Sequence, residues 1–187
     1  MNGLVIGLIV VGVIALVVIL WAVGVYNKLV RIRQHLKDSW SGVDVELKRR
    51  YDLIPNLVET VKGYASHEAE TLEAVIAARQ GGVDADGPAA QAEAENVITG
   101  ALGRLFALSE AYPDLKADSS FLNLQEELSG IEGKIAYARQ YYNDSVTRYH
   151  NAIESFPSNL IAGGFGFTKR EYFETDGEAR GPVEVQF

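Results

Sequence analysis

The sequence predicts an all-α protein: an N-terminal transmembrane helix that continues into an antiparallel four-helix bundle of long helices, followed by an irregular Gly/aromatic C-terminal tail. Three observations support this class. Residues 4–25 hold no charge, and 19 of these 22 residues are apolar, the other three being glycine. Apolar residues then recur at three- and four-residue steps as far as Pro157. Strand pairs joined by hairpin turns are not indicated before that proline. We therefore expect an anchor over residues 1–25, a bundle over 26–157 and a tail over 158–187.

The uncharged block is long enough to cross a bilayer. As an α-helix, Leu4 to Val25 would extend roughly 33 Å, close to the ~30 Å hydrocarbon core. A single spanning segment must satisfy its own backbone groups, so a helix is favoured over a strand despite the valine and isoleucine content. Trp21 and Tyr26 mark its C-terminal end, where amphipathic rings prefer the headgroup region.

The flanking charges predict the orientation. No lysine or arginine precedes the block, whereas Lys28, Arg31, Arg33 and Lys37 follow it closely. The positive-inside rule therefore places the N-terminus outside and the bundle in the cytoplasm, with these basic residues beside the lipid. A cleaved signal peptide is the alternative interpretation, but it requires a basic leading region and an apolar core of about 7–15 residues. Neither is present.

Charge changes sign along the chain, whose net charge is −8. Residues 28–62 hold eight basic and five acidic residues, a net of +3, and residues 63–187 hold nine and twenty, a net of −11. This acidic balance argues against a nucleic-acid partner. Lys48, Arg49 and Arg50 would lie about 35 Å beyond the membrane boundary on a straight helix. They predict a partner-binding site or a buried ion pair, with a solvated cluster as the alternative.

Prolines and glycines predict the helix boundaries. A first helical stretch covers about residues 26–51, and Asp52 is a candidate N-cap for a second helix that contains Pro55 in its first turn and runs to Gln80. A kink at Pro55 within one helix is the alternative. Residues 81–88 form the clearest expected loop, with glycines at one end and proline at the other.

The last two helices are predicted from their apolar faces. The third begins at Pro88 and ends before Pro113, and its predicted face is Ala90, Ala94, Val97, Ala101, Leu105, Leu108 and Tyr112. A short connection follows, with Asp118 and Ser119 as candidate caps. The fourth helix shows the most regular stripe, which comprises Phe121, Leu124, Leu128, Ile131, Ile135, Ala138, Tyr142, Val146, Tyr149 and Ile153.

The tail is unlike the bundle in composition. Glycines alternate with Phe165 and Phe167, Phe173 follows, and the chain ends in alternating Val183, Val185 and Phe187. These aromatic residues predict docking onto the bundle or onto a neighbouring copy, so Phe165, Phe167 and Phe173 are candidate partner-binding residues.

Sequence motifs for chemistry are incomplete. The chain has no cysteine, which excludes disulfides, a thiol nucleophile and thiolate metal sites. Residues 67–71 begin like the zinc-peptidase motif, but Thr71 stands where the second histidine is required. We therefore predict no catalytic residue, no metal site and no cofactor.

Long motifs resemble the LemA family. They are residues 26–30 (YNKLV), 40–58 (WSGVDVELKRRYDLIPNLV), 61–64 (VKGY), Tyr142-Asn143, Tyr149-His150, 155–157 (SFP), and 166–167 (GF) through 173–174 (FE). At position 150 this chain has histidine where the family usually has asparagine. The resemblance implies a bacterial protein with one N-terminal span and long helices, and it carries over no enzymatic activity, cofactor or catalytic residue.

The favoured function is a non-enzymatic scaffold or adaptor, anchored at the cytoplasmic face of the bacterial inner membrane and self-associating. Its expected partners are the lipid bilayer, further copies of itself and other membrane proteins. Two alternatives stay open: a membrane-remodelling protein that organises curvature, and an enzyme or metalloprotein with an unrecognised site.

Overall fold

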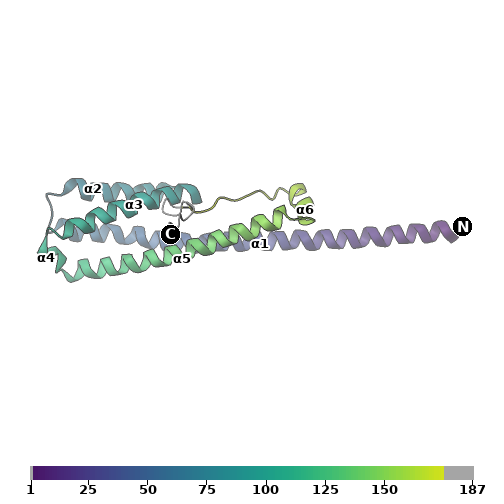
Figure 1. Ribbon diagram of the computed structural model, residues 1–187, viewed down its shortest axis with the longest axis horizontal. Helices are drawn as coiled ribbons and strands as arrows, with labels where there is room; N and C mark the ends of the chain where they lie inside the picture. The colour runs from purple at the N-terminus through teal and green to yellow at the C-terminus, as the bar shows by residue number, and fades with distance from the viewer. Residues whose placement is uncertain (1, 175–187) are drawn as a thin grey trace, which may run out of the picture. The chain divides into compact units, whose positions relative to one another are not determined.

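The computed structural model describes residues 2–174 and confirms the all-α class (Figure 1). No strand occurs among those residues. The helices are α1 (Asn2–Lys62), α2 (Ala69–Asp84), α3 (Pro88–Ser109), α4 (Pro113–Lys116), α5 (Ser119–Glu154) and α6 (Ser158–Gly164). The chain divides into two compact units, each described separately below. Unit 1 comprises Met1–Trp40 and Asp144–Arg170, and unit 2 comprises Ser41–Asn143 and Glu171–Phe187.

Helix α1 does not end before Pro55, so the expected second helix starting there is wrong. The helix runs through this proline to Lys62, and the break falls at residues 63–68. Packing explains the difference. The residues that follow Leu47 on the same face are fully or almost fully buried, namely Ile54, Leu57, Val58 and Val61. Each buried side chain of this size contributes about 1.5–3 kcal/mol, which together exceeds the ~3 kcal/mol cost of an internal proline.

The loop expected at residues 81–88 is shorter than predicted. Helix α2 continues through Gly81 and Gly82 to Asp84, and α3 begins at Pro88 as predicted. Gly87, at φ +85°, makes the turn. Gly82 is not a helix breaker here because it is buried, and a side chain at this position would collide with Tyr51 and Ile98. Gly82 therefore allows α2 to lie close to Tyr51 of α1 and Ile98 of α3.

The buried face of α3 differs from the predicted one. Val97 is 60% exposed, whereas the adjacent Ile98 is 1% exposed. The residues that face the core are Gln91, Ala92, Glu95, Ile98, Ala101, Leu102, Leu105 and Ser109. The prediction was wrong because three polar residues, Gln91, Glu95 and Ser109, belong to the buried face. A face chosen from apolar residues alone is therefore placed at a different angle around the helix.

The short connection expected before α5 contains a single helical turn, α4. The predicted cap is present: Oδ1 of Asp118 accepts a hydrogen bond from the Phe121 amide at 2.9 Å. Oδ2 of the same carboxylate accepts one from the Tyr64 hydroxyl at 2.9 Å. The predicted stripe of α5 is largely confirmed, with buried residues at Phe121, Leu128, Ile131, Ile135, Tyr142, Val146, Tyr149 and Ile153.

The Asp118 cap makes unit 2 sensitive to acid. Hydrogen bonds from the Phe121 amide and the Tyr64 hydroxyl hold the pKa of Asp118 below its ordinary value of 3.8. A lowered folded-state pKa contributes stability that is present above the unfolded value and is lost as pH falls through the folded value. We expect Asp118→Asn to have a lower Tm than the wild type at pH 6, and the difference to shrink below pH ~4. A difference in Tm that is independent of pH would contradict this.

The helices of unit 2 contact one another at several points. Arg79 of α2 donates to the backbone oxygen of Tyr51 in α1 at 2.7 Å, and Phe106 of α3 packs edge-on against Phe121 of α5 with ring centroids 6.2 Å apart. Arg49 of α1 lies 3.4 Å from Glu127 of α5. Helices α2 and α3 also pack together. These contacts surround an apolar core to which α1, α2, α3, α4 and α5 all contribute.

The tail begins with a helix where irregular structure was expected. Helix α6 ends at Gly164, and the Phe167 amide donates to the Ala162 carbonyl at 3.1 Å across Gly166, which has φ +71°. This is the Schellman arrangement, in which glycine occupies the left-handed position that ends a helix. Residues 165–174 contain no helix. The alternating apolar residues predicted at 183–187 lie outside the described residues.

Candidate functional site

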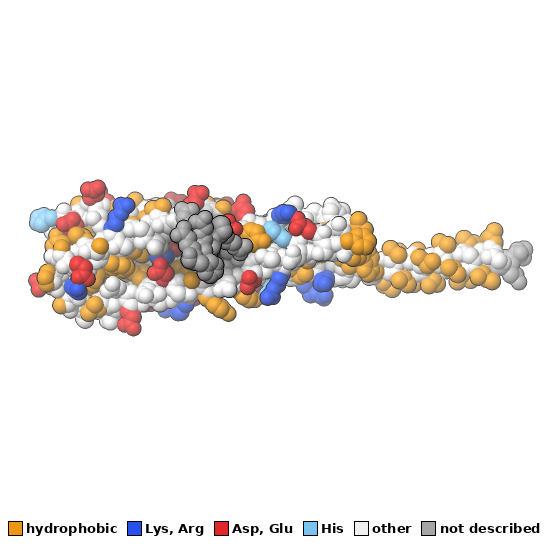
Figure 2. Space-filling view, viewed as in Figure 1, with side chains coloured by type: hydrophobic (Ala, Val, Ile, Leu, Met, Phe, Trp, Pro, Cys, Tyr) orange, Lys and Arg blue, Asp and Glu red, His pale blue; other side chains and the backbone are white. Residues whose placement is uncertain are grey.

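The N-terminal part of α1 presents apolar side chains in every direction. All residues from Gly3 to Trp21 are exposed, and the span is long and apolar enough to cross a membrane. Figure 2 shows apolar atoms along the visible face of this segment. An apolar surface of this extent has no counterpart on a typical soluble monomer, where contiguous patches cover only a few hundred Å².

An aromatic cluster in unit 1 lies directly after the apolar block. The ring of Tyr26 contacts Phe165 with centroids 5.1 Å apart and Phe167 with centroids 5.9 Å apart. The Arg33 guanidinium lies over the Phe167 ring at 4.9 Å from its centroid, a cation–π geometry. We call Tyr26, Arg33, Phe165 and Phe167 the collar. Phe165 is exposed and Phe167 is buried.

The structure thus brings together some predicted site residues and separates others. Lys28, Arg31 and Lys37 are exposed on α1, as is Trp21. Phe173 belongs to unit 2, where it is fully buried. Of the three phenylalanines, only Phe165 is exposed. The proximity of Tyr26 to Phe165 had no signal in the sequence, because about 140 residues separate the two positions.

Two side chains of α5 hold the segment that contains Phe173. The Asn143 amide nitrogen donates to the Phe173 carbonyl at 3.0 Å, and its amide oxygen accepts from the Phe173 amide at 2.9 Å. The Tyr142 hydroxyl donates to the Glu171 carbonyl at 2.8 Å. These contacts give a physical role to the Tyr-Asn motif: it pairs with the backbone of residues 171–173.

Replacing Asn143 by alanine should release this segment. Both hydrogen bonds to residue 173 would be lost, and at about 1 kcal/mol net per bond the local opening becomes easier by about 1–2 kcal/mol. Amide hydrogen exchange at residues 171–174 is expected to accelerate several-fold, with residues 128–135 of α5 as the internal control. Unchanged protection at residue 173 would show that the buried ring alone holds the segment.

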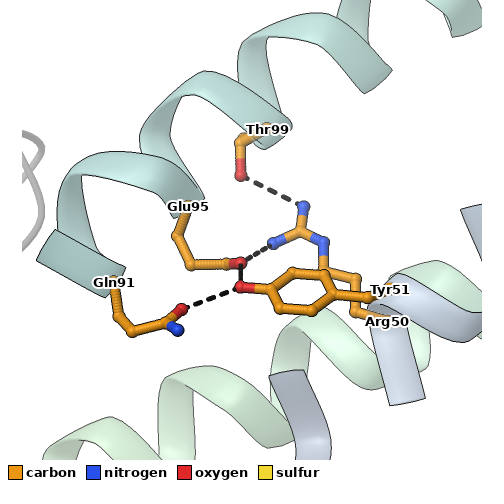
Figure 3. A network of polar contacts seen from close by, with 5 residues as sticks. All are labelled: Arg50, Tyr51, Gln91, Glu95 and Thr99. Carbon is orange, nitrogen blue, oxygen red and sulfur yellow. Dashed lines mark hydrogen bonds and ion pairs between the residues drawn. The ribbon is translucent and has the colours of Figure 1, made fainter. Parts of the chain in front are cut away.

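A buried polar network connects α1 and α3 in unit 2 (Figure 3). Nη1 of Arg50 lies 2.6 Å from Oε2 of Glu95, and both side chains are 5% exposed. Nη2 of Arg50 donates to the Thr99 hydroxyl at 3.1 Å. Oε1 of Glu95 accepts from the Tyr51 hydroxyl at 2.6 Å, and Oε1 of Gln91 lies 2.9 Å from the same hydroxyl. Arg50 therefore forms the buried ion pair that the sequence left open.

The network keeps the Tyr51 phenol protonated. Burial raises the pKa of Tyr51 far above its ordinary value of 10.0, and its hydrogen bond to the Glu95 carboxylate raises it further. The Gln91 amide nitrogen donates to the carbonyls of Gly82 and Ala85 at 3.1 and 3.0 Å, which fastens the α2–α3 turn to the same network. Within residues 2–174, the Nε of Arg50 is the network atom without a partner. The network therefore holds α1, α3 and the α2–α3 turn together.

The other two residues of the basic cluster have different surroundings. Arg49 faces Glu127 with both side chains about half exposed, and Lys48 is exposed. The sequence analysis did not identify Glu95 and Gln91 as buried. Their spacing is the signal that could have found them: Gln91, Glu95, Ile98 and Leu102 follow at steps of four, three and four residues, so the two polar residues share a helix face with two large apolar ones.

Residues 2–174 contain no group of three or more His, Asp or Glu side chains that could hold a metal ion. The Nε2 of His150 accepts a hydrogen bond from the Arg170 amide at 3.0 Å, and His35 and His67 are exposed.

The fold and its site define an all-α protein with one apolar N-terminal helix and a helical unit that is joined internally by a buried polar network. The sequence model of the LemA family matches residues 39–187, and the chain belongs to this family. Together, family membership and the apolar helix support a membrane-associated protein.

Curated relatives agree with this family. The chain is 28% identical to magnetosome protein MamQ of Magnetospirillum gryphiswaldense, over 79% of this chain, and 27% identical to magnetosome protein MamQ 2 of Paramagnetospirillum magneticum, over 80%. It is 29% identical to protein LemA of Metamycoplasma hominis over 75%. In each case the similarity covers 64% of the relative, less than two-thirds of its length.

Proposed function

We propose that the chain is a non-enzymatic helical scaffold or adaptor, anchored in the bacterial inner membrane with its helical units in the cytoplasm, and self-associating there. The observation that carries the proposal is the wholly exposed apolar segment of α1, followed by the cations Lys28, Arg31, Arg33 and Lys37. The first feature supports insertion, and the second supports the orientation.

The buried polar groups support a structural role. Arg50, Tyr51, Gln91 and Glu95 are engaged with one another or with backbone carbonyls inside unit 2. Such groups hold helices in register rather than present reactive atoms to a substrate. Elemental analysis of the purified full-length protein provides a test: a stoichiometric metal would contradict the non-enzymatic assignment.

Orientation can be tested with reporters fused to each end. We expect a reporter after Phe187 to be active only in its cytoplasmic form, and a reporter before Met1 only in its external form. Reversing the flank, by changing Lys28, Arg31 and Arg33 to glutamine and adding lysines before Leu4, should shift the population toward the opposite orientation. An external C-terminal reporter in the wild type would contradict the proposal.

Self-association is supported by large apolar side chains that unit 2 leaves exposed on α1 and α3, Val45 and Val97. We expect light scattering of the full chain in mild detergent to give a defined oligomer. In native membranes, the same species should be captured by crosslinking. A monomer at every concentration tested would contradict self-association and leave the anchor unaffected.

Membrane remodelling is the second candidate function. The exposed apolar residues of α6 and its flanks favour it, because apolar side chains inserted at shallow depth occupy headgroup area. Imaging of liposomes with and without the full-length protein separates the two: a passive scaffold leaves vesicle size unchanged, and a remodelling protein changes vesicle size or shape.

A further inference from the structure

Helix α6 and its flanks expose three large apolar side chains. Phe156 is 79% exposed, Leu160 is 64% exposed and Phe165 is 62% exposed. They occur within ten residues of each other, and the neighbouring Ala162 and Phe167 are buried. Isolated exposed apolar residues need no explanation, but three on one short turn-and-helix segment mark a surface that contacts something apolar.

The collar places this segment at the end of the apolar block. Phe165 contacts Tyr26, which directly follows Val25, the last residue of the uncharged stretch. Arg33, which covers the Phe167 ring, comes seven residues later, about 10 Å further along the helix. The collar therefore has an apolar end, where the exposed Phe165 ring contacts Tyr26, and a polar end, where the Arg33 guanidinium lies.

We propose that Phe156, Leu160 and Phe165 insert into the headgroup region of the bilayer leaflet from which α1 emerges. This inference rests on the proposed anchor and adds a second membrane contact, made by the C-terminal part of the chain. The bilayer is the occupant because Phe165, the last of the three, contacts Tyr26 at the end of the apolar helix. Aromatic rings at this depth have an apolar body and tolerate partial hydration.

The surrounding charges fit a lipid surface. Lys28 and Arg31 follow Tyr26 on α1 and are exposed, and Lys169 and Arg170 follow Phe167 and are also exposed. Cations near anionic headgroups are attracted to the membrane surface. Lys169 is also paired with Glu154 of α5 at 2.5 Å, which holds the end of the segment to its unit.

The segment is ordered by its own contacts. The Schellman turn at Gly166 ends α6, and the Ser158 hydroxyl lies 2.7 Å from the Ala152 carbonyl at its start. The Arg170 amide is bound by His150. Order before insertion lowers the entropic cost of placing the three side chains in the interface.

The absence of cysteine allows single reporter sites. We would change Phe156, Leu160 or Phe165 to cysteine in the full-length chain, attach an environment-sensitive fluorophore, and reconstitute it in phosphatidylethanolamine–phosphatidylglycerol vesicles. The quenchers are aqueous iodide and lipid nitroxides placed near the headgroup or near the chain end. Ile14→Cys reports the centre of the span, and Tyr137→Cys is the matched control, since Tyr137 is 74% exposed but lies in unit 2.

The expected result is quenching by the shallow nitroxide at positions 156, 160 and 165, by the deep nitroxide at 14, and by iodide alone at 137. Iodide quenching at 156, 160 and 165 with deep quenching at 14 would overturn the inference and leave the anchor intact. Iodide quenching at 14 would instead show that the anchor fails. Protection of position 160 from iodide without any lipid quenching would show that protein, such as a second copy, covers the segment, and would also overturn the inference.

Discussion

Replacing Arg50 by methionine is expected to lower the free energy of unfolding by about 3–5 kcal/mol. The change leaves the Glu95 carboxylate buried without its guanidinium partner, although the Tyr51 hydroxyl still donates to it. An uncompensated buried charge costs more than the net contribution of the intact pair, because the partner has already lost its hydration. Urea unfolding of the full chain in mild detergent, followed by circular dichroism, measures the change.

The adjacent arginine is the matched control. Arg49 also faces a glutamate, Glu127, but both side chains are about half exposed, so Arg49→Met should cost at most about 1 kcal/mol. Adding Glu95→Gln to Arg50→Met should recover part of the loss, since glutamine removes the buried charge and keeps an oxygen for Tyr51. Equal costs for Arg50→Met and Arg49→Met would contradict a structural role for the network.

Gly82→Ala is the second large effect. A Cβ at this position would lie 2.8 Å from Cζ and the hydroxyl of Tyr51 and 2.9 Å from Cδ1 of Ile98. Tyr51 is held by Glu95 and moves only by disturbing the buried network, so we expect a loss of about 1–3 kcal/mol.

Gly81 offers a control one residue away. A Cβ there meets nothing within 4 Å, and the position is helical and exposed. Gly81→Ala should therefore raise the free energy of unfolding by about 0.5–1 kcal/mol through helix propensity. In urea unfolding, we therefore expect Gly82→Ala to lower the free energy of unfolding and Gly81→Ala to raise it. Stabilisation by both would show that the approach of α2 to Tyr51 is looser than described.

The accuracy of the sequence predictions depended on how purely apolar each buried face is. The stripe of α5 could be predicted because nearly all its members are apolar. The face of α3 could not, because Gln91 and Glu95 occupy core positions and are stabilised by partners on other segments. Pro55 and Gly82 were interpreted as local signals, yet tertiary packing outweighs the local preference at both positions.

At the candidate site, too, features that depend on local composition could be predicted, whereas those that depend on tertiary contacts could not. The apolar block and the cations after it could be predicted, since they depend on local composition. The burial of Arg50 required knowing which acidic residue of another helix it meets. The contact of Tyr26 with Phe165, and hence the exposed neighbours Phe156 and Leu160, depends on where the chain returns after α5. A single sequence contains no periodic pattern for such a contact.

The pairing of Asn143 with residue 173 places a different chemical requirement on each of the two positions. One amide side chain substitutes for a neighbouring β-strand, since it offers a donor and an acceptor to the two polar groups of a single residue. Aspartate would keep the acceptor and lose the donor, and glutamine would extend the reach by one methylene. Position 143 is thus constrained by hydrogen-bond polarity, whereas position 173 is constrained by ring volume. Homologues should vary independently at the two positions, each within its own chemical limits.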